Sequence, residues 1–213
     1  MPVRAKICGV STPDAIAAAI KGGASHVGFV FFAKSPRHVD IERAAELARL
    51  VPGDVGRVGL FVDPDPGFLA MALARVPLEV IQLHGSESPT FAASVVSTHG
   101  KEVWKAIPVR TRADLAAGSH YRGAVQRLVY DAKPPKGAEL PGGNGLRFDW
   151  KLLDGHVHSL PWMLSGGLDA ANVAEAVGTT TARMVDVSSG VETAPGVKNV
   201  DKIAAFLQAV ARL

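Results

Sequence analysis

The sequence has little cysteine, few aromatic residues and only a small excess of positive charge. Cys8 is the only cysteine among 213 residues, which excludes an intrachain disulfide and fits a reducing compartment. Lys and Arg exceed Asp and Glu by only three, and no basic run carries interleaved aromatics. No apolar run approaches the ~20 residues of a membrane span, and the first residues lack a secretory-signal pattern. These absences predict a cytoplasmic protein with no nucleic-acid or membrane partner.

Short apolar segments alternate with amphipathic segments along the chain, and 47% of the residues are hydrophobic. Several apolar segments are continuous rather than alternating, which is typical of parallel strands covered on both faces. We expect eight strands, at Val3–Cys8, His26–Phe31, Arg57–Val62, Glu79–Leu83, Val103–Ile107, Arg127–Asp131, Trp162–Leu164 and Met184–Val187. We expect helices at Thr12–Lys21, Ile41–Leu50, Gly67–Ala74, Thr90–His99, Ala170–Val177 and Val200–Arg212, and short candidates at Arg112–Ala117 and near Asp149–Leu153.

Eight strand–helix units in 213 residues predict an α/β fold, a single-domain (β/α)8 TIM barrel over residues 1–213. Barrels of this kind contain at least about 200 residues. An open, doubly wound sheet is the alternative, but it requires a glycine-rich phosphate loop after the first strand. The residues there are Cys8-Gly9-Val10-Ser11, which lack that pattern. No change of composition marks a second domain.

Two reactive side chains lie at the carboxyl ends of predicted strands, and we expect both on the same face of the barrel. Cys8 ends the first strand just before a helix N-terminus, a position that can lower a thiol pKa. Asp131 ends the sixth strand, so it would face Cys8 across the barrel mouth. General acid–base catalysis needs two such groups flanking the reacting atoms. The alternatives are an inert buried cysteine and an aspartate that only forms a turn.

Three further polar residues are candidates for binding a substrate. Gln82 and His84 alternate with apolar neighbours, so both should point into the barrel at its top. A hydrogen-bonded structural pair is the alternative. Arg37 follows the second strand and could hold a carboxylate bidentately, or it could be a solvated loop residue. The seven histidines form no cluster with metal-ligand spacing, so we expect no metal.

Glycine-rich turns gather in the last third of the chain, at Gly142-Gly143-Asn144-Gly145, Ser165-Gly166-Gly167 and Ser188-Ser189-Gly190. Barrels of this class often bind phosphate with the loops after strands seven and eight. Glycines let backbone N–H groups approach an anion closely, although any single glycine can also serve only a tight turn. The candidate phosphate-binding residues are Gly143, Gly145, Gly166, Gly167, Ser188, Ser189 and Gly190.

Lys6 shares a strand face with Cys8, so its side chain should also point into the barrel. A buried lysine needs a partner. Strand eight closes against strand one in a barrel, and it contains Asp186. We therefore expect a Lys6–Asp186 ion pair inside the barrel, with a mainly structural role.

The chain resembles the phosphoribosylanthranilate isomerases, a family of tryptophan biosynthesis, over nearly its whole length and in order. The matching segments are Lys6-Ile7-Cys8-Gly9, Gly28-Phe29-Val30-Phe31, Lys34-Ser35-Pro36-Arg37, Gln82-Leu83-His84-Gly85, Phe148-Asp149-Trp150, Ser165-Gly166-Gly167-Leu168, Asn172-Val173, Asp186-Val187-Ser188-Ser189-Gly190-Val191-Glu192 and Ala194-Pro195-Gly196-Val197-Lys198. The chain departs from the family pattern at Tyr130, Asn144 and Asn199. We expect Asn144 to alter the phosphate contact slightly, and the other two to lie off the barrel interior.

This resemblance implies the Amadori rearrangement of N-(5-phosphoribosyl)anthranilate to 1-(2-carboxyphenylamino)-1-deoxyribulose 5-phosphate, with no cofactor. It implies that Asp131 is the general acid, Cys8 the general base and Arg37 the partner of the anthranilate carboxylate. The glycine turns match the family's phosphate cradle. The implied partner is one phosphorylated small molecule, and we expect a monomer, with a homodimer as the alternative.

Three other functions remain as alternatives. A sugar-phosphate isomerase of histidine biosynthesis would have an aspartate where this chain has Cys8. A phosphopentose epimerase would need metal ligands that the sequence lacks. A barrel that only binds a phosphorylated ligand would have no need of both Cys8 and Asp131.

Overall fold

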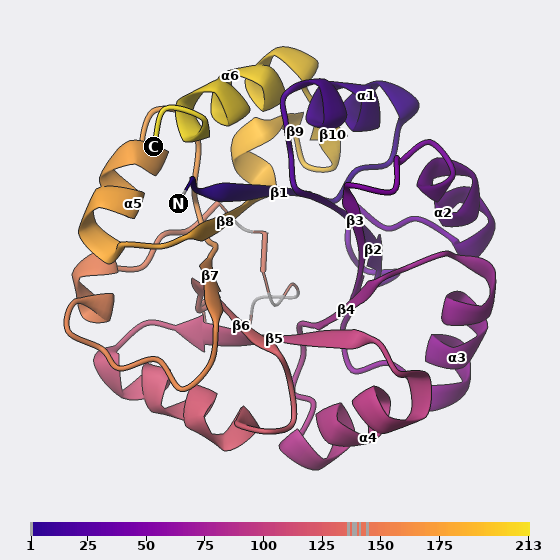
Figure 1. The fold of residues 1–213 in the computed structure, drawn as a ribbon, viewed down its shortest axis with the longest axis horizontal. Coiled ribbons are helices and arrows are strands. Elements are labelled where there is room, and N and C mark those ends of the chain that lie inside the picture. Colours follow the sequence, from indigo (N-terminus) through magenta and orange to yellow (C-terminus); the bar gives the residue numbers. More distant parts are fainter. Residues whose placement is uncertain (1, 136, 138–139, 141, 144) are drawn as a thin grey trace.

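Eight parallel strands close into a barrel in the computed structural model, which describes residues 2–135, 137, 140, 142–143 and 145–213. Each strand pairs with its sequence neighbours, and β8 pairs with β1 to complete the ring (Figure 1). The barrel strands are β1 Arg4–Cys8, β2 His26–Phe31, β3 Gly56–Phe61, β4 Val80–Leu83, β5 Glu102–Val109, β6 Arg127–Ala132, β7 Trp162–Leu164 and β8 Met184–Val187. The predicted (β/α)8 barrel is thus confirmed.

Helices surround this ring (Figure 1). In the described residues they are α1 Pro13–Lys21, α2 Ile41–Ala48, α3 Pro66–Arg75, α4 Pro89–His99, α5 Val173–Thr180 and α6 Val200–Val210. Most of them begin at a side chain that accepts a hydrogen bond from the first turn. The residues that cap in this way are Thr12, Asp40, Asp65, Ser88 and Asn199. None of these helices is long and apolar enough to cross a membrane, as judged over the described part of the chain.

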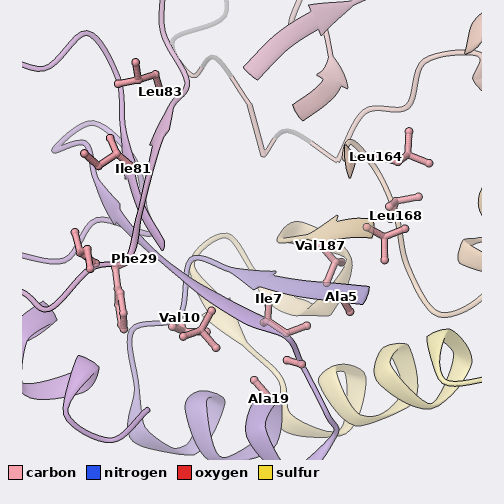
Figure 2. Packing of buried hydrophobic residues seen from close by; sticks show 14 of the residues in the cluster. Ala5, Ile7, Val10, Ala19, Phe29, Ile81, Leu83, Leu164, Leu168 and Val187 are labelled. Carbon is pink, nitrogen blue, oxygen red and sulfur yellow. The ribbon is translucent and has the colours of Figure 1, made fainter. Parts of the chain in front are cut away.

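The hydrophobic core has two layers. Outward-facing strand residues such as Ile7, Phe29 and Val187 pack against the helices, and Ala19 of α1 lies close to Ile7 (Figure 2). Inward-facing residues fill the lower barrel with a second cluster, made of Val58, Val80, Trp104, Ala106, Val129, Met163 and Met184. Polar residues take over toward the carboxyl ends of the strands, which is where a barrel of this kind places its active site.

The structure departs from the sequence expectations in the second half of the barrel. Where short helices were expected, the chain forms 3-10 turns, η1 at Arg112–Tyr121 and η2 at Trp150–Leu153. Helix α5 begins at Val173 rather than Ala170, because the Asp169 carboxylate accepts from the backbone N–H groups of Ala171 and Asn172 and holds them in a turn.

A small hairpin that the sequence analysis did not predict follows β8. After the 3-10 turn η3 (Ser189–Val191), strand β9 (Glu192–Ala194) pairs antiparallel with β10 (Val197–Lys198). Gly196, with φ +84°, makes the turn between them and packs against the Pro36 carbonyl. The hairpin therefore brings the segment after β8 onto the loop after β2.

Candidate active site

One cavity at the carboxyl ends of the strands collects most of the predicted site residues. Its wall includes Cys8, Arg37, His84, Asp131, Gly143, Gly145, Gly166, Gly167, Ser188 and Ser189. Gln82 and Gly190 are not part of this wall. Asn144 lies outside the described residues. The cavity is also lined by Val30, Leu60, Phe32 and Val62, which form an apolar wall beside the Cys8 thiol.

Cys8 is buried beside an ion pair inside the barrel. Lys6 Nζ donates to Asp186 Oδ1 at 2.9 Å, and neither side chain is more than 5% exposed. This is the predicted Lys6–Asp186 pair. A methyl group added at Gly28 would lie 3.1 Å from both Cys8 Sγ and Lys6 Cε, so the missing side chain at Gly28 makes room for them.

The position of Cys8 in the sequence could lower the thiol pKa, but in the structure burial acts in the opposite direction. Burial raises the pKa of the Cys8 thiol above its ordinary 9.0, and the Lys6 ammonium opposes this shift only in part. A helix N-terminus or a cation lowers a thiol pKa when the thiol is partly exposed, whereas Cys8 is 4% exposed. The thiolate is therefore a minor species at neutral pH, and it is a strong base when it forms.

Asp131 is hydrogen-bonded to His84 on the opposite side of the cavity. His84 Nε2 lies 3.1 Å from Asp131 Oδ2, and Gln82 Nε2 lies 3.0 Å from His84 Nδ1. The other oxygen, Asp131 Oδ1, accepts from the backbone N–H of Ala132 at 2.9 Å. Asp131 and His84 are thus fixed in place, and both still line the cavity.

Arg37 is a buried residue that the β9–β10 hairpin holds in place. Its Nε and Nη2 each donate to one carboxylate oxygen of Glu192 at 2.8 Å, and Nη2 also donates to the Gly143 carbonyl at 3.0 Å. Lys198 Nζ donates to Glu192 Oε1 at 2.6 Å. Burial opposes ionisation of Glu192, but the hydrogen bond from Arg37 and the charge of Lys198 hold the pKa of its carboxyl below the usual range. Among the described residues, Nη1 of Arg37 has no hydrogen-bond acceptor, and Arg37 lines the cavity.

Glycines of the first two turns line the cavity together with Ser188 and Ser189 of the third, and the two serines differ. The Ser188 hydroxyl donates to the Cys8 carbonyl at 3.1 Å and accepts from Lys198 Nζ at 3.1 Å. It is therefore already engaged, so an anion would reach Ser188 through its backbone N–H. In the part of the chain that the structure describes, the Ser189 hydroxyl has no such partner and remains available.

Two glycines in these turns are required by close approach. A methyl group at Gly166, where φ is +90°, would lie 2.7 Å from the backbone nitrogen of Ala132 and 2.9 Å from Asp131 Oδ1. A methyl group at Gly190 would overlap the Leu168 carbonyl oxygen. Gly190 therefore packs the loop after β8 against the loop after β7, and it does not line the cavity.

Sequence reasoning assigned no role to Glu192 and Lys198, which form the buried network around Arg37 and Ser188. Both residues lie in segments that match the family, but their contacts were not expected because the hairpin that places them was not predicted. The Pro195-Gly196 turn was the one local feature that could have indicated it. Among the described residues, no group of three or more His, Cys, Asp or Glu side chains is arranged to hold a metal ion.

A (β/α)8 barrel with a thiol, a carboxyl group and glycine-lined loops around one cavity defines a class: barrel enzymes that perform acid–base chemistry on phosphorylated small molecules. The comparisons with known proteins are more specific. Residues 5–209 match the family model described as N-(5'phosphoribosyl)anthranilate (PRA) isomerase. The chain belongs to this family.

Individual relatives agree with the family model. The N-(5'-phosphoribosyl)anthranilate isomerase of Rhodospirillum centenum is 58% identical over 214 residues, covering 100% of both chains. The solved phosphoribosyl anthranilate isomerase of Thermotoga maritima superposes with a TM-score of 0.89 at 34% identity, covering 99% of this chain and 100% of that one. A solved isomerase complex with reduced 1-(o-carboxyphenylamino)-1-deoxyribulose 5-phosphate gives a TM-score of 0.84 at 32% identity, covering 99% of this chain and 100% of that one.

Proposed function

We propose that the protein isomerises N-(5'-phosphoribosyl)anthranilate to 1-(2-carboxyphenylamino)-1-deoxyribulose 5-phosphate in tryptophan biosynthesis. The observation that carries this proposal is the shared cavity of Cys8 and Asp131, which end β1 and β6 and lie beside the glycine turns. An Amadori rearrangement needs a proton donor at the ring oxygen and a base at C2′, and the cavity contains one candidate for each.

Asp131 acts first, as the general acid. It gives its proton to the ribose ring oxygen as the C1′–O bond breaks, and the nitrogen lone pair forms the C1′=N bond of a protonated Schiff base. His84 Nε2 lies 3.1 Å from the carboxyl group that is left ionised. A hydrogen bond to a carboxylate is stronger than one between neutral groups, so this contact favours the proton transfer.

Cys8 acts second, as the general base. Its thiolate removes the C2′ proton, and the electron pair moves toward the protonated nitrogen to give an enolamine. The proton held by Cys8 then goes to C1′, and the C2′ hydroxyl proton returns to Asp131 as the ketone forms. Both groups are restored, and the substrate's own nitrogen is the electron sink, so the reaction needs no cofactor or metal.

The remaining residues bind the two ends of the substrate. We assign the anthranilate carboxylate to Arg37 Nη1, because Nε and Nη2 are already occupied by Glu192 and Gly143. The apolar wall of Val30 and Leu60 suits the aromatic ring. The phosphate is assigned to the backbone N–H groups of the loops after β7 and β8 and to the Ser189 hydroxyl.

The direct test adds purified protein to freshly made phosphoribosylanthranilate and follows the loss of its fluorescence, with the product identified by mass spectrometry. We expect decay well above the spontaneous rate, with the ribulose phosphate as product. Tight binding of the reduced product analogue without any acceleration would instead show a barrel that only binds a phosphorylated ligand.

We further propose that the protein acts in the cytoplasm, where Cys8 stays reduced, and as a monomer. Cys8, Asp131 and Arg37 meet in the cavity of a single barrel, which supports this proposal. One Thermotoga maritima relative is described as dimeric, which makes a homodimer the alternative. Sedimentation equilibrium at micromolar concentration decides between the two states.

A further inference from the structure

Gln82 forms the inner end of a buried hydrogen-bonded chain that runs through His84 to Asp131. We propose that Gln82 is a positioning residue that sets the tautomer of His84, and that it acts on Asp131 only through that histidine. This replaces the sequence-based expectation that Gln82 contacts the substrate. The inference rests on the proposed role of Asp131 as general acid.

The placement of Gln82 excludes direct contact with a ligand in the cavity. Its side chain is fully buried, and it is not part of the cavity wall, whereas His84 and Asp131 both are. Strand alternation on β4 directs Gln82 and His84 to the same interior face, with Gln82 one layer deeper. Gln82 can therefore influence the chemistry only through the residue above it.

The hydrogen-bond donors fix the direction of the chain. In the amide orientation of this structure, Nε2 of Gln82 faces His84 Nδ1 at 3.0 Å, and because an amide nitrogen only donates, Nδ1 accepts. A neutral imidazole has one N–H, which then lies on Nε2 and points at Asp131 Oδ2, 3.1 Å away. In this tautomer His84 presents a donor to the carboxylate that remains after Asp131 has given up its proton.

The Gln82 amide lowers the stability of the fold, which indicates that it has a specific role. Its Oε1 is buried and has no hydrogen-bond partner among the described residues. An unpaired buried acceptor destabilises the fold, whereas a methionine of similar length would fill the same space without it. The contact with His84 is the feature that accounts for an amide at this position.

The hydrogen bond between His84 and Asp131 is also covered by the backbone of Gly142. A methyl group at Gly142 would lie 2.5 Å from His84 Nε2 and 2.6 Å from Asp131 Oδ2, so the backbone of Gly142 packs directly on this hydrogen bond. On the side that faces Gly142, this hydrogen bond is therefore closed to another donor.

The kinetic test compares Gln82→Met with the native protein. We expect kcat to fall at least tenfold while KM changes less than twofold, because Gln82 does not touch the cavity. In a His84→Ala background, the same Gln82→Met change should alter kcat less than twofold. Equal losses in both backgrounds, or an effect on KM alone, would overturn the proposal. Val80→Ala, two residues earlier on β4 in the lower barrel cluster, controls for general loosening of the interior.

A spectroscopic test starts from the native protein and adds one variant at Gln82. Nitrogen-15 NMR of the native protein at pH 7.5, with the His84 signals assigned by their loss in His84→Ala, should show hydrogen on Nε2 and none on Nδ1. Gln82→Glu, whose carboxylate only accepts, should move a hydrogen onto Nδ1. A hydrogen on Nδ1 in the native protein sinks the inference even if Gln82→Met does not fold. Failure of the native protein to isomerise its substrate would instead refute the proposed function and leave this tautomer assignment standing.

Discussion

At the scale of single residues, Cys8, which we propose as the general base, lies in surroundings that make its thiol hard to ionise. Cys8 is enclosed by the apolar side chains of Val30 and Leu60, and the cationic Lys6 lies beside it. Burial disfavours the thiolate and the ammonium favours it, and burial has the larger effect. The thiolate that does form is correspondingly basic, which suits removal of a proton from carbon.

This balance predicts how Cys8 reacts with iodoacetamide as the pH changes. Alkylation follows the thiolate fraction, so its midpoint should lie above pH 9.0 in the native protein. Lys6→Met removes the charge that opposes the shift, and the midpoint should move to still higher pH. Lys133→Met, on an exposed lysine paired with Asp114, should leave it unchanged. A lower midpoint in Lys6→Met would contradict this account of the thiol.

The residues that sequence reasoning found are those for which strand position alone is informative. Cys8, Asp131 and His84 are polar groups at the ends of apolar strands, and the fold brings such ends together. Sequence could not show that Arg37 is held by Glu192, because that contact joins residues 155 positions apart through an unpredicted hairpin. For Gln82 the sequence left two roles open, a substrate contact or a hydrogen-bonded pair with His84, because alternation gives the direction of a side chain but not its depth. The structure contains the Gln82–His84 hydrogen bond.

At the scale of elements, the barrel is closed by polar as well as backbone contacts between β1 and β8. Lys6 and Asp186 are direct register partners on these strands, and their charges meet at 2.9 Å inside the barrel. Ser165 on the loop after β7 adds a longer hydrogen bond to Asp186 at 3.4 Å. The pair could be predicted from sequence because strand alternation and barrel closure leave Lys6 no other carboxylate at its level.

Removing one partner of this ion pair should destabilise the protein more than removing both partners. Lys6→Met leaves the Asp186 carboxylate buried and unpaired, and we expect a loss of about 3–5 kcal/mol in the free energy of unfolding. The double variant Lys6→Met/Asp186→Leu removes both charges and should recover most of that loss. Urea unfolding followed by circular dichroism measures both. A double variant as unstable as Lys6→Met would show that the cost arises from packing and not from the stranded charge.

Element boundaries followed the sequence where capping residues mark them. Thr12, Asp40 and Ser88 begin helices close to the expected positions, because their side chains accept from the first turn. The start of α5 was misplaced, since Asp169 makes a turn that resembles a cap in sequence. The hairpin β9–β10 was missed because its strands are too short to show a period.

At the scale of the whole molecule, the ends of the barrel differ in chemistry. The upper end carries the cavity, while the lower end is filled by Trp104 and by His26, whose rings lie 5.2 Å apart. Burial lowers the pKa of His26 to about 3, and the cations Arg4, Lys6 and Arg127 act in the same direction. His26 is thus neutral in the folded protein at pH values where an unfolded chain would bind a proton there.

The lowered pKa of His26 predicts that the free energy of unfolding decreases as the pH falls. Above its ordinary pKa of 6.5, the neutral His26 makes its full contribution to the stability of the fold. As the pH falls from 6.5 toward 3, that contribution is lost, because the unfolded chain binds a proton there and the folded protein does not. From the size of the shift, we expect this contribution to amount to about 5 kcal/mol. His26→Gln should show a much flatter dependence of unfolding free energy on pH between 6.5 and 4. An unchanged slope would assign the acid sensitivity to other groups.

The central claim is that Cys8 and Asp131 perform the chemistry while other groups hold the substrate. The most direct measurement determines kcat for Cys8→Ala and Asp131→Asn, together with the dissociation constant of the reduced product analogue for each. We predict that each change lowers kcat by about 10²–10⁴-fold and leaves the dissociation constant within a factor of about three, because the phosphate and carboxylate contacts remain. Full activity in Cys8→Ala, or a loss that appears only in binding, would contradict the account.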